Sequence, residues 1–233
     1  MSGLASALAT GSNGSGVTSG TTADGGTATH YLQPGNMLLQ QVDYNNSTLG
    51  SASVGTTSMP TPTTNASFLG TVAGGDFIGW GYWAAGTNTV SGSGSSMQDV
   101  HYVVGTPTPT MPTTGSKTYG TVLGYTQPTF TTSGPAQSVT FGSASLDVNF
   151  QAGNGHAQVD VTVGSTPVSI SGTVHVDGAT FATNAAAPAP THIGGIFVGS
   201  SGGFPARAGM VYSQDITSGG PGGRVAGAVV LGP

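Results

Sequence analysis

Five histidines are the side chains in this sequence best suited to hold a metal ion or move a proton: His30, His101, His156, His175 and His192. None belongs to a spacing such as His-Glu-x-x-His, and the chain has no cysteine for a structural zinc site. Asp99 and His101 are two residues apart, as are His175 and Asp177, so each pair lies on one face of an extended strand. Such pairs are typical of a solvated polar face, and metal ligation is the alternative.

A second candidate is the aromatic run Gly-Trp-Gly-Tyr-Trp at residues 79–83. In a strand, Trp80 and Tyr82 share one face and Trp83 lies on the other. Aromatic side chains beside glycines could form a stacking platform for a sugar or a porphyrin. They could equally fill the core of a small β-barrel, which is the more frequent role of such residues.

Nothing in the sequence indicates an enzyme. No serine occurs in a Gly-x-Ser-x-Gly context with the strand and helix that a nucleophile requires. The chain has no Glu, and its carboxylates have no neighbours that would tune an acid and a base. The Gly-rich stretch at 199–204 lacks the Lys of a phosphate-binding loop. We therefore predict neither catalysis nor a cofactor.

The charge balance limits the partners. The net charge of −5 combines eight Asp with three cations, Lys117, Arg207 and Arg224. Three scattered cations cannot follow a phosphate backbone or dock on anionic lipid, which argues against nucleic acid and membrane surfaces. No apolar run approaches the length of a membrane-spanning helix, and without a cysteine nothing supports a lipid anchor. The low charge and the abundance of Ser, Thr and Gly favour an exported, extracellular or cell-surface bacterial protein.

The elements that must position these residues are strands. Gly supplies 41 of the 233 residues and charged residues only 5%, so the usual helix formers are scarce. From residue 36 onward, short runs rich in Val, Thr and aromatic residues alternate with turn signals, and no helical period interrupts them. The pattern predicts an all-β fold, either an antiparallel β-barrel of about eight or more strands or a barrel-like sandwich. Residues 36–233 are predicted to form this domain, and the Gly/Ser/Thr-rich residues 1–35 an extended arm.

Alternation is clearest in residues 156–163, where apolar side chains occupy one face and polar side chains the other. This predicts a half-buried strand with a solvated outer face. By contrast, residues 224–231 are apolar or small on both faces, as in a closing barrel strand or one covered by another surface. The Thr/Pro run at 105–115 cannot be a central strand, because Pro107, Pro109 and Pro112 donate no ladder hydrogen bond. It is predicted to be a stiff surface crossover; an exposed segment offered to a partner is the alternative.

Three segments resemble a known family. They are "DFIGWGYWAAG", "DVHYVVGTPTPTMPTTGSKTYG" and the Gly-rich ending from His192 to Gly232. Together they look like the C-terminal β-domain of bacterial FecR-domain-containing exported proteins. More broadly, the last quarter resembles the small barrels of transferrin-binding-protein-B-like surface proteins. The resemblance implies a barrel fold and an exported location. It implies no catalytic residues, and since the FecR sensor domain itself is absent it carries no signalling role.

Turn chemistry predicts a register. Asn154-Gly155 is the strongest signal for a two-residue type I′ turn, and it would set Phe150 opposite Val159. A symmetric turn in the next loop would set Val161 opposite Ile170 and His156 opposite His175. Opposed residues are about 5 Å apart at Cβ, so His156 and His175, with Asp177, could share a divalent metal. Two solvated histidines are the alternative.

The same alternation predicts which side chains face inward. They are Leu146, Val148, Phe150, Val159, Val161, Ile170, Val174 and at least one of Trp80 and Trp83.

Two functions remain open. The first is a structural, self-assembling filament or surface-layer subunit, whose arm adds a strand to a neighbouring subunit. The alternative is a monomeric barrel module of the transferrin-binding-protein-B type, which binds a protein, a glycan or a haem-like ligand. The predicted partners are accordingly further copies of the chain or another surface protein.

Overall fold

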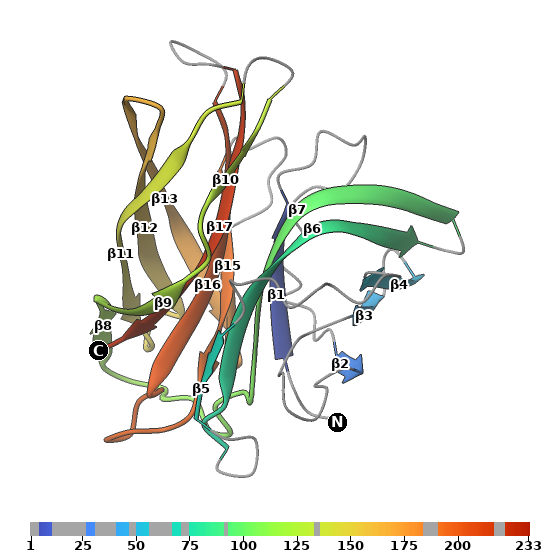
Figure 1. The fold of residues 1–233 in the computed structure, drawn as a ribbon. Coiled ribbons are helices and arrows are strands. Elements are labelled where there is room, and N and C mark those ends of the chain that lie inside the picture. Colours follow the sequence, from blue (N-terminus) through green and yellow to red (C-terminus); the bar gives the residue numbers. More distant parts are fainter. Residues whose placement is uncertain are drawn as a thin grey trace.

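The computed structural model describes the backbone of residues 5–10, 27–30, 41–46, 50–55, 67–70, 75–90, 93–132, 136–183, 191–216 and 222–233. Side chains are described for 67–70, 75–82 and 99 onward within these ranges. The described residues form seventeen β-strands and no helix, so the predicted all-β class is confirmed (Figure 1). No helix of the described part is therefore a candidate for a membrane span.

The first sheet has seven strands, in the order β1-β7-β6-β4-β3-β2 with β5 beside β6. Their bounds are β1 Ala5–Thr10, β2 Thr27–His30, β3 Gln41–Asn46, β4 Gly50–Gly55, β5 Ser67–Leu69, β6 Ile78–Val90 and β7 Ser93–Gly105. Strands β1 and β2 belong to the segment predicted as an arm, and they lie at the two edges of this sheet. β1 pairs antiparallel with β7 of the same chain, from Ala5 opposite Gly105 to Thr10 opposite Val100. The domain boundary at residue 35 stays a prediction.

The second sheet has ten strands, in the order β10-β17-β16-β15-β14-β13-β12-β11-β8 with β9 beside β17. Their bounds are β8 Ser116–Tyr119, β9 Thr121–Tyr125, β10 Thr129–Thr131, β11 Val139–Asn149, β12 Asn154–Val163, β13 Thr166–Asp177, β14 Thr180–Thr183, β15 Thr191–Val198, β16 Arg207–Ile216 and β17 Gly223–Gly232. All its pairings are antiparallel.

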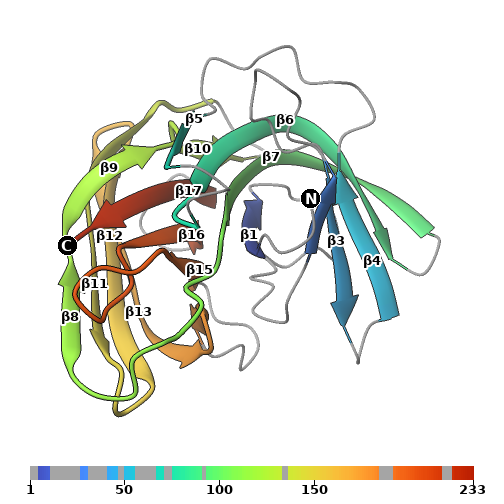
Figure 2. The ribbon, with the colours of Figure 1, turned by 90° about the horizontal axis from the view of Figure 1, so that it is seen from below.

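The ten-stranded sheet curls without closing into a regular barrel (Figure 2). β8 pairs with β11, whereas β9 pairs with β17, and only Gly120 separates β8 from β9. The two ends of the sheet therefore meet across one bent segment. Of the two predicted architectures, the barrel-like sandwich is therefore the one observed. Strands β6 and β7 arch away from it.

Two hydrophobic cores follow from this arrangement. The larger one fills the inside of the curled sheet and includes Leu146, Phe197, Met210 and Tyr212. The smaller one lies between the two sheets and brings Ile78, Trp80 and Val103 against Ile196, Val198, Val211, Ala228 and Val230. Strands β15, β16 and β17 are consequently buried on both faces. Of the two predicted explanations for residues 224–231, a covering surface is therefore the one observed.

The predicted inward face is correct. Each of the seven aliphatic and aromatic residues predicted to face inward between Leu146 and Val174 is at most 7% exposed, as is Trp80. The polar residues that alternate with them on β12 are exposed or partly exposed. Burial of the apolar set fixed the faces of these strands, as the alternation predicted.

The predicted registers are wrong. Asn149 lies opposite Asn154, so Asn154 and Gly155 are in the strand, and the hairpin loop is Phe150 to Gly153. Two features compete with the Asn-Gly signal. The side chain of Asn149 accepts a 3.0 Å hydrogen bond from the backbone of Ala152, and Gly153 adopts a φ of 64°. Phe150 packs against Phe197 and Phe204, which holds the start of the loop over the core.

In the next hairpin the pairing is displaced by two residues from the predicted one. Val163 lies opposite Thr166, which leaves Gly164-Ser165 as a two-residue turn with Gly164 at a φ of 61°. His156 therefore lies opposite Thr173, and His175 lies opposite Asn154. The direct opposition of His156 and His175, on which the metal hypothesis depended, does not occur.

The Thr/Pro run links the two sheets and is largely exposed, as a crossover should be. It is held at several points: the Thr106 backbone donates to the Phe77 carbonyl at 2.8 Å, and the Gly115 carbonyl accepts from the Phe150 backbone at 2.9 Å. Thr108 donates through its backbone to the Phe197 carbonyl and through its hydroxyl to the Gly199 carbonyl, at 2.9 and 2.8 Å.

Candidate functional site

Two rows of polar side chains cross the outer face of β8, β11, β12 and β13. The ladder places Thr118 opposite Asp147, Asp147 opposite His156, and His156 opposite Thr173. We call this the first row. The second row, two residues along each strand, consists of Ser116, Asn149, Asn154 and His175. Both rows exist because alternation on each strand turns its polar residues outward, and because the registers align those residues.

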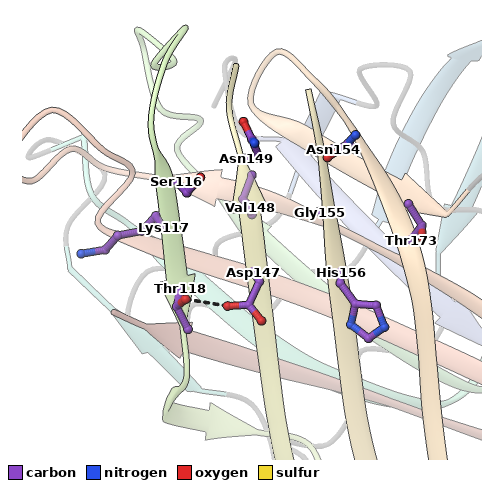
Figure 3. Close-up of a pocket in the computed structure, with 10 residues that line it drawn as sticks. All are labelled: Ser116, Lys117, Thr118, Asp147, Val148, Asn149, Asn154, Gly155, His156 and Thr173. Carbon is purple, nitrogen blue, oxygen red and sulfur yellow. Dashed lines mark hydrogen bonds between the residues drawn. The ribbon is translucent and has the colours of Figure 1, made fainter. Parts of the chain in front are cut away.

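An open groove of about 510 Å³ lies between these rows (Figure 3). Its lining consists of Ser116, Lys117, Thr118, Asp147, Val148, Asn149, Asn154, Gly155, His156 and Thr173. Four neighbouring strands span about 14 Å at ~4.8 Å per spacing, so the groove suits an elongated ligand lying across the strands.

Two hydrogen bonds orient the groove side chains. The Thr118 hydroxyl donates to Asp147 Oδ1 at 2.5 Å, which leaves Asp147 Oδ2 as an acceptor. Asn149 Oδ1 is engaged by the Ala152 backbone, which leaves the Asn149 amide nitrogen as a donor. The groove therefore presents both donors and acceptors. Such a set recognises hydroxyl groups, each of which both donates and accepts.

The predicted metal ligands are only partly brought together. His156 belongs to the first row, His175 to the second, and Asp177 lies further along β13, opposite Thr180. No group of three His, Cys, Asp or Glu in the described part of the chain is placed to hold a metal ion. His156 instead lies beside Asp147 on the adjacent strand.

The aromatic candidates Trp80 and Tyr82 occupy the space between the sheets. Trp80 is 5% exposed and lies over Gly124 of β9, where an added Cβ would collide with its ring. Its position fits the core alternative rather than an open stacking platform. Tyr82 is partly buried, and the side chain of Trp83 lies outside the described residues.

A polar network surrounds Tyr82 at the edge of the intersheet core. The Tyr82 hydroxyl donates to Asp99 Oδ1 at 2.5 Å, and the Thr131 hydroxyl donates to Asp99 Oδ2 at 2.9 Å. His101, predicted on a solvated face, is fully buried because that face of β7 is covered by the other sheet. Its two ring nitrogens lie 2.7 Å from Thr126 Oγ1 and 2.9 Å from Thr129 Oγ1.

Burial sets the protonation of this network. It lowers the pKa of His101 to about 3, so the imidazole is neutral at neutral pH. Burial, and then the hydrogen bond to Asp99, raise the pKa of the Tyr82 phenol. The His101 imidazole is neutral and bonded to two hydroxyls, and the Tyr82 phenol is protonated. These polar contacts link the two sheets and do not form an acid–base pair.

Sequence reasoning identified the polar face but not the groove. Asp147 and Asn149 are recognisable as outward residues from their alternation with Leu146 and Val148. The position of Asn154 depends on a register that the turn signal predicted incorrectly, and that of Thr118 on the β8–β11 pairing, which was not predicted from the sequence. Once Asn154 is placed in the strand, the two rows follow.

The chain matches no protein-family model, and a comparison with curated proteins gave no match. Among solved structures, two mutants of Transferrin Binding Protein B from Haemophilus parasuis Hp5, a vaccine antigen, are similar to it. The first covers 82% of the chain at 12% identity with a TM-score of 0.42. The second, a double mutant, covers 72% at 17% identity with a TM-score of 0.41.

The chain spans only 37% and 36% of the length of those two proteins. The similarity concerns the outline of a β fold. The resemblance to FecR-domain-containing proteins receives no support from these comparisons.

Proposed function

We propose that this chain is a non-enzymatic binding module that holds a neutral, hydroxyl-rich ligand, such as a glycan, in the groove between the two polar rows. The observation that carries the proposal is the alignment of Thr118, Asp147 and His156 on three adjacent strands beside an open groove. A pocket of a few hundred Å³ with a few convergent polar groups is typical of small-ligand sites.

The composition of the groove favours a sugar over the other ligands considered. Its outward side chains offer amides, hydroxyls, an imidazole and one carboxylate, while the Lys117 side chain extends away from them (Figure 3). A haem-like ligand would require a mainly apolar pocket. A single carboxylate also gives no acid and base pair for glycoside hydrolysis, so the groove is suited to binding alone.

The binding role replaces the filament as the preferred function. In the filament hypothesis the N-terminal arm adds to a neighbouring subunit. The described strand β1 instead pairs with β7 of its own chain. The extracellular or cell-surface location remains part of the proposal, and it is supported by the low charge and the high Ser, Thr and Gly content.

Isothermal titration calorimetry with a panel of neutral di- and trisaccharides tests this function. We expect at least one saccharide to bind, and Asp147→Ala to weaken its binding about tenfold, because a charge-assisted hydrogen bond is lost. Asp160→Ala is the matched control: Asp160 lies on the outer face of β12, is held by Ser143, and does not line the groove. Absence of binding across the panel, or equal losses for the two variants, would contradict the proposal.

A further inference from the structure

The ten-stranded sheet is split between β9 and β11. β11 pairs with β8 only from Leu146 to Asn149, and from Val139 to Ser145 its ladder partner is β12 alone. β9 has its ladder partner in β17. No strand pairing or backbone hydrogen bond joins β9 to β11, although both strands are fully described. Two strand edges therefore face each other without a ladder.

Side chains take the place of that ladder. If the β8–β11 register continued past Gly120, Tyr125 would lie opposite Thr140. Instead the rings of Tyr125 and Phe141 stack at 4.4 Å and 15°, and Gln127 Nε2 donates to the backbone carbonyl of Val139. A register shift between Phe141 and Ser143 bends β11 at this point. The Gln127 amide thus occupies an acceptor that a neighbouring strand would normally use.

The split leaves apolar surface open to solvent. Tyr125 lies opposite Val229, an interior residue that is completely buried, yet Tyr125 is 45% exposed. Val122 and Leu123 on the same strand are 36% and 39% exposed. Behind them, Tyr212 is fully buried, and its hydroxyl has no hydrogen-bond partner among the residues that the structure describes.

We propose that the split between β9 and β11 is an acceptor for an extended, uncharged peptide strand from a partner protein. An extended backbone is the group that satisfies the unpaired donors and acceptors of a strand edge. The residues along both edges, 121–127 and 139–145, include no charged side chain. A neutral peptide therefore suits these edges, whereas a charged side chain would lose its hydration there without gaining a partner.

The guest strand must compete with two contacts. It displaces Gln127 from the Val139 carbonyl, and it separates the Tyr125–Phe141 stack while covering the exposed parts of Leu123 and Tyr125. This predicts effects of opposite sign: removing the competing amide strengthens binding, and placing a charge on the apolar edge weakens it.

The test uses a fluorescein-labelled peptide, acetyl-Thr-Val-Thr-Val-Thr-Tyr-Thr-Val-amide, and fluorescence anisotropy with the whole chain. A second peptide has the same side chains, with alternate backbone nitrogens methylated so that it cannot donate to a ladder. We expect saturable binding of the first peptide and about tenfold weaker binding of the second. Equal binding of the two peptides, or no saturable binding of the first, would overturn the proposal.

Three variants locate the site. Gln127→Ala should tighten binding by about threefold, because a competing hydrogen bond is removed. Leu123→Lys should weaken it about tenfold by putting a charge against the neutral guest. Phe68→Lys, at an equally exposed apolar residue on β5, should have no effect. Unchanged affinity in both split variants would refute the assignment, as would sedimentation showing that the split is already occupied by a second copy of the chain.

Discussion

The two halves of the ten-stranded sheet differ in what covers their outer face. On β11, β12 and β13, buried and exposed residues alternate along most of each strand, because the outer face meets solvent. On β15, β16 and β17, long runs are buried without alternation, because β6 and β7 cover the outer face. The first half carries the groove of polar side chains, whereas the second half holds the two sheets together.

Glycine also serves the two halves differently. On the covered side it allows close approach, as at Gly124 beneath the ring of Trp80. On the solvated side, Gly153 and Gly164 adopt positive φ in the hairpin turns. The following predictions test this contrast, from the largest expected effect to the smallest.

Trp80→Ala should destabilise the protein by about 3–5 kcal/mol, because it empties the centre of the intersheet core. Ser171→Ala, at an exposed position of β13, should change stability by less than about 0.5 kcal/mol. Urea unfolding monitored by circular dichroism measures both changes. Similar losses of unfolding free energy in the two variants would show that the covered and solvated halves of the ten-stranded sheet do not differ as described.

Stability should fall as the pH is lowered from about 6.5 toward 3. Burial lowers the pKa of His101 to about 3 in the folded chain, while in the unfolded chain the pKa is about 6.5. The unfolded state therefore binds the extra proton within this window, at a cost to stability on the order of 1 kcal/mol per pH unit. In His101→Gln the dependence of the unfolding free energy on pH should become weaker, whereas in the control His175→Gln it should remain. Chemical denaturation at several pH values is the measurement. An unchanged pH dependence of stability in His101→Gln would count against the burial of a neutral His101.

Gly124→Ala should cost about 1–3 kcal/mol, because the new methyl group enters the space of the Trp80 ring. Gly120→Ala is the control, since nothing lies within 4 Å of its added Cβ, and it should stay within about 0.5 kcal/mol. Thermal unfolding of the pair measures the difference. Equal melting temperatures would place Trp80 away from β9.

Ser143→Ala should raise the pKa of Asp160 toward its ordinary value. The Ser143 hydroxyl, which donates to Asp160 Oδ2 at 2.8 Å, is the main cause of the lowered pKa, while burial opposes it and Ser169 and Gln158 assist. Because Asp160 is mostly solvated, we expect little change in stability at neutral pH. NMR titration of the carboxyl carbon follows the pKa directly; no upward movement would mean that Ser143 is not the main partner.

The sequence predicted the faces of the strands better than their partners. Val159 and Ile170 were assigned to the interior correctly, because burial of one face is a property of each strand alone. The register depended on competing turn signals: Asn154-Gly155 is favourable locally, but the Asn149 side chain and the burial of Phe150 place the loop at residues 150–153 instead. That competition involves Phe197 and Phe204, which are distant in sequence and could not be read from the hairpin.

The same limit applied to the candidate site. His156 and Asp147 were both placed on the outer face, but their opposition on neighbouring strands was not predicted, because it follows from the register. A covering surface over residues 224–231, which form β17, was one of the two alternatives that their apolar pattern indicated. The identity of that cover, β6 and β7, required the three-dimensional structure.

The proposed function is tested most directly by backbone amide chemical-shift mapping with the saccharide that binds most tightly. The account predicts that the perturbed amides cluster on β8, β11, β12 and β13 around Thr118, Asp147 and His156, while those of β15, β16 and β17 remain unchanged. Perturbations centred on β6, β7 or the covered half of the sheet, with the groove residues unaffected at saturation, would contradict it.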